Sequence, residues 1–139
     1  YALDRPGKVA GLVLAEPETE NMLEGMRRGM PADAWRSRME ERSRPNADGV
    51  RVDALLRRAA RRAFPDRPVT VLTATRRPSG AGWIARWINE AARRHQGALV
   101  AGLRLGRHVP ATGSGHDIPV DAPDLVAEEV LRVVRLRGR

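Results

Sequence analysis

The sequence predicts a three-layer α/β fold in which helices cover both faces of a partial parallel sheet. Three short segments have the composition of strands, and helix-like stretches separate them along the chain. The first segment, residues 9–15, is a continuous apolar run without polar alternation, which is typical of a strand buried on both faces. Regular alternation of strands with helices favours parallel pairing through crossover helices.

The first strand is expected between two turn signals. Residues 1–5 read as the end of a helix, which Pro6 and Gly7 stop because proline cannot continue a helix and glycine accepts the turn. Glu16 and Pro17 end the strand at its far side. Because the chain opens on the end of a helix, we expect that other neighbours of this strand precede the chain.

A helical region is expected between the first and second strands. Residues 18–44 are polar and helix-prone, and Pro31 is expected to divide them into two helices. A further amphipathic helix is expected over residues 52–64, where apolar residues recur at spacings of three and four. The apolar stripe of the first stretch consists of Met22, Met26, Met30, Trp35 and Met39.

The second half of the chain continues the alternation. Residues 69–75 are rich in β-branched side chains and are expected to form the second strand. Residues 83–105 are mostly helical in pattern, and residues 107–112 form a third strand that is polar enough to lie near a sheet edge. Residues 113–116 then form a tight loop, and Pro123 opens the last helix because proline suits a first helical position.

The composition restricts the classes of function. The chain has 139 residues, 42% hydrophobic and 30% charged, which fits one globular domain. It has no cysteine, which excludes disulfides and thiolate-bound zinc and leads us to expect a cytoplasmic location. No apolar run reaches the roughly 18 residues of a membrane span. The net charge is +8, but most arginines occur at helix-like spacing without a nucleic-acid-binding motif, so we expect no nucleic-acid partner.

The residues that follow the three expected strands indicate a functional site. In open parallel sheets, functional groups gather beyond the carboxyl ends of the strands. Glu16 follows the first strand, and His116 follows the third on a glycine-flanked loop. After the second strand come Thr75, Arg76 and Arg77, without a carboxylate. We therefore expect the carboxylate of Glu16 and the imidazole of His116 at the same edge of the sheet.

These segments resemble a known family. Residues 113–119, which read GSGHDIP, and residues 121–130 after them closely resemble the catalytic-histidine loop and final helix of α/β hydrolases. Residues 1–15 look like the helix after the nucleophile elbow of that fold, leading into its sixth strand. The resemblance implies that residues 1–139 are the C-terminal part of one α/β-hydrolase domain, with its last three strands, and that residues 20–64 are a helical cap or lid.

The resemblance also implies a catalytic mechanism. These enzymes use a nucleophile, an acid and a histidine in that chain order, and His116 would be the catalytic histidine. The nucleophile elbow, Gly-x-Ser-x-Gly, is expected upstream of this chain. None of the serines present has the outer glycines of that motif: Ser37, Ser43, Ser79 and Ser114. We therefore expect a serine ester or acyl hydrolase whose nucleophile is missing here, so that this chain alone is inactive.

The resemblance leaves the identity of the acid open. In most members it follows the seventh strand, but residues 74–89 contain no Asp or Glu. In other members, including some haloalkane dehalogenases, it follows the sixth strand, which is where Glu16 stands. Glu16 would accept the Nδ1 proton of His116 and stabilise the imidazolium. Glu18, Glu20 or no acid in this chain are the alternatives.

Two other functions fit the same residues. The acid after the sixth strand is also compatible with an aspartate nucleophile, as in dehalogenases and epoxide hydrolases, where the histidine activates a water molecule. A hydrolase-like scaffold without catalysis would instead be a binding module. The residue at the nucleophile elbow, serine or aspartate, would distinguish the ester hydrolase from the dehalogenase-like enzyme.

The expected ligand is a small, apolar ester or a related molecule. Met22, Met26 and Trp35 could line its pocket under the cap, because methionine adapts to varied ligand shapes. Simple packing is the alternative interpretation of these side chains. The three histidines lack metal-ligand spacing, so we expect no metal and no other cofactor.

Overall fold

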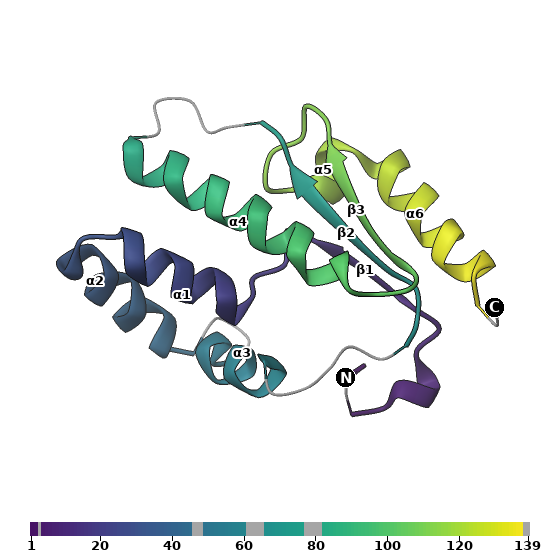
Figure 1. The fold of residues 1–139 in the computed structure, drawn as a ribbon, viewed down its shortest axis with the longest axis horizontal. Helices are drawn as coiled ribbons and strands as arrows, with labels where there is room; N and C mark the ends of the chain where they lie inside the picture. The colour runs from purple at the N-terminus through teal and green to yellow at the C-terminus, as the bar shows by residue number, and fades with distance from the viewer. Residues whose placement is uncertain (3, 46–48, 61–65, 77–81, 138–139) are drawn as a thin grey trace.

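The computed structural model describes residues 1–2, 4–45, 49–60, 66–76 and 82–137. It has a mixed α/β fold with one parallel sheet of three strands, in the order β1-β2-β3 (Figure 1). The strands are β1 (Leu12–Ala15), β2 (Val69–Ala74) and β3 (Gly106–Ala111). The expected α/β class and parallel pairing are therefore confirmed for the described part of the chain.

The register brings the carboxyl ends of the strands to one edge. Ala15 of β1 lies opposite Leu72 of β2, and Ala74 of β2 lies opposite Ala111 of β3. β2 and β3 begin within one residue of the expected positions. β1 is shorter than expected, because strand pairing begins only at Leu12.

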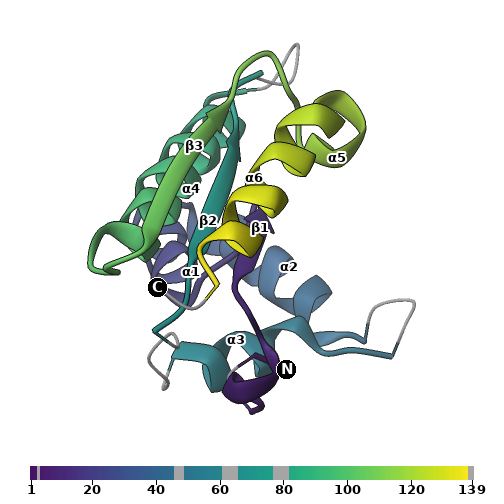
Figure 2. The same ribbon diagram turned by 90° about the vertical axis from the view of Figure 1, so that its right-hand side faces the viewer.

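The helices are distributed over both faces of the sheet. Figure 2 shows α4 on one face and α5 and α6 on the other, with the sheet between them. In the described part of the chain, three α-helices lie between β1 and β2, one lies between β2 and β3, and two follow β3. They are α1 (Glu20–Gly29), α2 (Ala32–Ser43), α3 (Val52–Ala60), α4 (Trp83–Ala101), α5 (Ile118–Asp121) and α6 (Pro123–Arg135).

Strand β2 supplies buried side chains to two cores, because successive residues of a strand point to opposite faces. On the α4 face, Val69 and Val71 pack with Val100 of α4. On the other face, Leu72 packs with Ile118 of α5 and with apolar residues of α6. The outer strands are less buried than β2. β1 is half-buried rather than covered on both faces as expected, and half of the residues of β3 are exposed, in keeping with its polar sequence.

A third core lies between the helices that follow β1 and helix α4. Met22 and Met26 of α1 are buried there, with 3% and 1% of their surface exposed, and Trp87 of α4 packs against them. The hydroxyl oxygen of Thr19 caps α1 by accepting a hydrogen bond from the backbone N–H of Met22 at 3.1 Å. Pro31 separates α1 from α2, as expected.

The chain start differs from the expectation. Residues 1–5 do not form the end of a helix in their described part. The backbone N–H groups of Asp4 and Arg5 both bond the carbonyl of Tyr1 in a turn. A short 3-10 helix, η1 (Pro6–Lys8), then begins at the proline that was expected to end a helix, because proline also suits the first position of one.

Candidate functional site

Glu16 directly follows β1 and is fixed at the carboxyl edge of the sheet. Its backbone N–H extends the ladder by bonding the carbonyl of Leu72 at 2.9 Å. Its side chain reaches over the end of β2, where Oε1 accepts a hydrogen bond from the backbone N–H of Ala74 at 2.7 Å. The side chain is 17% exposed, and φ is +50°, in the left-handed region that non-glycine residues seldom adopt. One hydrogen bond to β2 thus holds the backbone of Glu16, and another holds its carboxylate.

His116 lies in the loop after β3 and meets this carboxylate. Its Nδ1 atom is 3.7 Å from Oε2 of Glu16, while the rest of the ring is open, with 86% of the side chain exposed. β1 and β3 are not neighbours in the sheet, so the contact depends on the Glu16 side chain crossing the end of β2. The structure therefore brings together the two residues that the sequence placed at one edge.

The loop that carries His116 is tied to the end of β2 by the side chain and backbone of Thr75. The hydroxyl group of Thr75 donates to the carbonyl of Ala111 at 3.1 Å and accepts from the backbone N–H of Gly113 at 2.8 Å. The carbonyl of Ser114 accepts from the backbone N–H groups of Thr75 and Arg76. Gly113 has φ of +78°, which favours glycine at this turn.

Asp121, in α5, holds the loop from its other side. Its Oδ2 atom accepts from the backbone N–H of Gly115 at 2.7 Å and from the guanidinium group of Arg76 at 2.8 Å. The Gly115 hydrogen bond, together with the positive charge and hydrogen bond of Arg76 and the hydroxyl of Ser114, lowers the pKa of Asp121. This carboxylate stays ionised and fixes the residue that precedes His116.

Helix α4 supports the opposite side of the site through two polar side chains. Arg93 donates to the carbonyls of Ala74 and Thr75, at 3.2 and 2.8 Å. Gln96, only 2% exposed, donates through Nε2 to the carbonyl of Pro17 at 3.3 Å. Arg93 thus holds the end of β2, and Gln96 holds the backbone directly after Glu16.

Gln96 belongs to a short chain of hydrogen bonds that reaches β3. Its Oε1 accepts from the hydroxyl group of Thr73 at 2.5 Å, and the Thr73 oxygen lies 2.8 Å from Nε2 of His108. Because the Thr73 proton is directed at Gln96, its oxygen is left to accept from His108, which places the proton of the neutral ring on Nε2. Partial burial lowers the pKa of His108.

These supporting residues do not stand out in the sequence. Arg93 and Gln96 stand in a helix rich in arginine, where polar side chains are expected to face solvent. The one available signal was their spacing of three residues, which places both on the helix face that carries the buried Val100.

The other candidates for the acid are placed differently. The carboxylate of Glu18 is held by a bidentate ion pair with Arg42 of α2 and lies 3.7 Å from Arg38. It is therefore engaged by α2 rather than by the His116 loop. The side chain of Glu20, and the whole of Ser79, lie outside the described residues.

The residues expected to line a substrate pocket are divided between a core and a surface hollow. Met22 and Met26 are packed in the core between α1 and α4. Trp35 is half-buried and lines a hollow of about 570 Å³ between α1, α2 and α3, together with Leu23 and Leu56. Neither methionine lines this hollow, so their contacts in the structure are those of packing.

The described residues contain no group of three or more His, Asp or Glu side chains that could hold a metal ion. None of the helices, over the same residues, combines the length and the apolar character needed to cross a bilayer.

Comparisons with known proteins give no further guide. No protein-family model, no curated protein and no solved structure matches this chain.

Proposed function

We propose that Glu16 and His116 are the acid and the general base of a nucleophile–acid–histidine triad in an ester hydrolase of the α/β-hydrolase fold. In this proposal the sheet corresponds to the last three strands of that fold, and α1 to α3 correspond to its cap. The nucleophile comes from a segment other than residues 1–139. The observation that carries the proposal is the 3.7 Å approach of Nδ1 of His116 to a carboxylate oxygen of Glu16.

The geometry suits the different roles of the acid and the histidine in such a triad. The acid is mostly buried and fixed by a backbone hydrogen bond, whereas the imidazole is open to solvent. With Nδ1 facing the carboxylate, Nε2 is left for the nucleophile and, later, for the leaving group. The Nδ1–Oε2 distance is longer than a hydrogen bond, and contacts of this kind often tighten only when substrate is bound.

The position of Glu16 also favours a second candidate function. In the resemblance, an acid that follows the sixth strand, here β1, is also compatible with an aspartate nucleophile. There His116 would activate water to break an alkyl-enzyme ester. The two functions differ in substrate, because the first enzyme would hydrolyse p-nitrophenyl esters and the second would open haloalkanes or epoxides.

The pair can be tested in the 139-residue chain by ¹⁵N NMR of the His116 ring. The hydrogen bond made by one ring nitrogen decides which nitrogen carries the proton of the neutral ring. We expect that proton on Nδ1 in the native chain, and on Nε2 after Glu16→Ala. Glu24→Ala, which removes an exposed carboxylate of α1, should leave the ring signals unchanged. Identical spectra for Glu16→Ala and the native chain would contradict the pairing.

Catalysis can be tested in a polypeptide that also supplies the nucleophile. His116→Ala and Glu16→Gln should each lower kcat for a p-nitrophenyl ester by about three orders of magnitude or more, with folding unchanged by circular dichroism. An unaffected Glu16→Gln enzyme would assign the acid to another residue.

A further inference from the structure

A basic hollow lies at the edge of the sheet opposite to Glu16 and His116. Two adjoining pockets, of about 580 and 530 Å³, meet at Leu105 and Leu136, which line both. They surround the amino-terminal ends of β2 and β3 and the C-terminal end of α6. We refer to the two pockets together as the basic hollow.

The basic hollow collects positive charge from distant parts of the chain. Six of its lining residues are cations, and one is an acid, Asp66. The cations come from η1, from the segment before β2, from the turn before β3 and from the end of α6: Lys8, Arg67, Arg104, Arg132, Arg135 and Arg137. Four segments far apart in sequence therefore converge on one concave surface.

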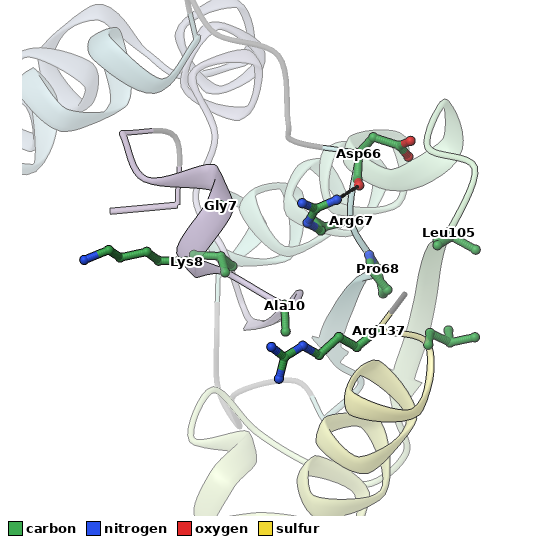
Figure 3. A pocket seen from close by; sticks show the side chains of 10 residues that line it. Gly7, Lys8, Ala10, Asp66, Arg67, Pro68, Leu105 and Arg137 are labelled. Carbon is green, nitrogen blue, oxygen red and sulfur yellow. Dashed lines mark hydrogen bonds between the residues drawn. The ribbon is translucent and has the colours of Figure 1, made fainter. Parts of the chain in front are cut away.

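Figure 3 shows how the first of the two pockets is arranged. The guanidinium group of Arg137 extends beneath Ala10, and Arg67 donates a hydrogen bond to the backbone carbonyl of Asp66 at 3.1 Å. The carboxylate of Asp66 points away from both arginines and lies 3.8 Å from Arg104. Within the described residues, the charges of Lys8, Arg67 and Arg137 have no carboxylate partner.

Helix ends account for only part of this charge. The C-terminal ends of α4 and α6 lie at this edge, and a helix C-terminus carries roughly half a negative charge, which favours nearby cations. These two ends and Asp66 offset about two of the six positive charges. Glu129 pairs with Arg132 at 3.9 Å. Among the described residues, about three of these positive charges therefore remain uncompensated. An anionic ligand would relieve their mutual repulsion.

We propose that the basic hollow binds a small organic molecule that carries two or more phosphate charges. Guanidinium groups donate paired hydrogen bonds that match phosphate oxygens, and five of the six cations are arginines. Leu105 and Leu136, both half-buried, supply apolar surface for the organic part of the ligand. This site is separate from Glu16 and His116 and does not depend on their catalytic role.

The shape of the site favours a small molecule over a nucleic acid. Each pocket has a volume within the range of roughly 300–1,000 Å³ that is usual for small-molecule sites. The cations of the first pocket line concave, partly apolar surface, and those of the second line a shallower hollow beside it. Contacts with a phosphate backbone are instead expected from a flat stripe of cations along one helix.

Titration calorimetry of the 139-residue chain with inorganic pyrophosphate and with ADP tests the site. We expect saturable binding of one ligand per chain. Arg67→Gln and Arg137→Gln should each weaken it about tenfold, because each removes a charged hydrogen-bond donor to phosphate. Both side chains are exposed, so the two variants should unfold at the same temperature as the native chain. If one of them unfolds at a lower temperature, Lys8→Gln is used in its place.

Two matched variants separate this proposal from others. Arg36→Gln removes an exposed arginine of α2 outside the basic hollow and should leave binding unchanged. Glu16→Gln should also leave it unchanged, so failure of the triad would not affect this result. Lack of saturable binding, or equal weakening by Arg36→Gln, would overturn the proposal. Displacement of pyrophosphate by a short DNA duplex at lower concentration would overturn it in favour of a nucleic-acid surface.

Discussion

The hydroxyl group of Thr70, in the middle strand β2, donates a hydrogen bond of 3.0 Å to Oε2 of Glu129 in α6. Both residues are fully buried, so a carboxylate is held between the sheet and the helix that covers it. Arg107 of β3, 3.2 Å from Oε1, and Arg132 of α6 provide the compensating charge. A polar contact of this kind specifies how α6 docks on the sheet.

Removal of this carboxylate should weaken the fold. Glu129→Ala leaves the Thr70 hydroxyl without its acceptor and two arginines without their partner. We expect a loss of about 2–4 kcal/mol in the free energy of unfolding, measured by urea denaturation. Glu128→Ala, at the exposed neighbouring position, should change it by less than about 0.5 kcal/mol. Equal losses in the two variants would show that the buried pair does not stabilise the chain.

The stability of a Met26 variant can show whether this side chain belongs to a packed core or to a ligand pocket. It is 1% exposed between α1 and α4, so Met26→Ala should create a cavity and cost about 2–5 kcal/mol of unfolding free energy. Met39→Ala, at a half-buried position of α2, should cost less. A loss below about 1 kcal/mol for Met26→Ala would mean that the space around it is open to solvent.

His108 should make stability depend on pH. Burial lowers its pKa below the ordinary value of 6.5, so the unfolded chain binds more protons than the folded chain between the two values. The stabilising contribution is therefore complete above pH 6.5 and decreases as pH falls through the lowered pKa. His108→Gln should flatten this part of the profile, measured by urea denaturation at a series of pH values. His95→Gln provides the control, and an identical flattening there would contradict the assignment.

Asp121 should control the rigidity of the His116 loop. Asp121→Ala removes the acceptor of the Gly115 N–H and the ion pair with Arg76, so we expect faster hydrogen exchange at the Gly115 amide. In the native chain, acidification through the lowered pKa of Asp121 should likewise reduce the protection of this amide, measured against its intrinsic exchange rate at each pH. Asp117→Ala removes an exposed carboxylate that makes no capping bond and should leave the exchange rate unchanged. Unchanged exchange in Asp121→Ala would show that other contacts hold the loop.

The sequence predicted the elements whose signal is local. The strand 69–75 was clear because its β-branched residues lie between prolines and a loop, and the division at Pro31 followed from the geometry of proline. The shared edge of Glu16 and His116 followed from the rule that parallel strands end together. The proximity of these two side chains was predictable for that reason, although their catalytic role stays a prediction.

Contacts that depend on register could not be predicted. The hydrogen bond from Ala74 to Glu16 requires the exact offset between β1 and β2, which no local pattern encodes. The burial of Gln96 depends on which side of α4 meets the sheet, and its polar character argues for the surface. Helix α5, with four residues, is too short for periodicity to reveal.

The left-handed backbone conformation of Glu16 lowers stability, whereas its carboxylate is needed for the proposed function. A residue with a Cβ atom loses about 1 kcal/mol in this conformation relative to glycine. A glycine would therefore suit the turn better, yet it would leave the backbone N–H of Ala74 without its acceptor and would remove the carboxylate that lies beside the ring of His116. β-branched substitutions would be the least tolerated here, since they combine the loss of the carboxylate with the most severe backbone strain.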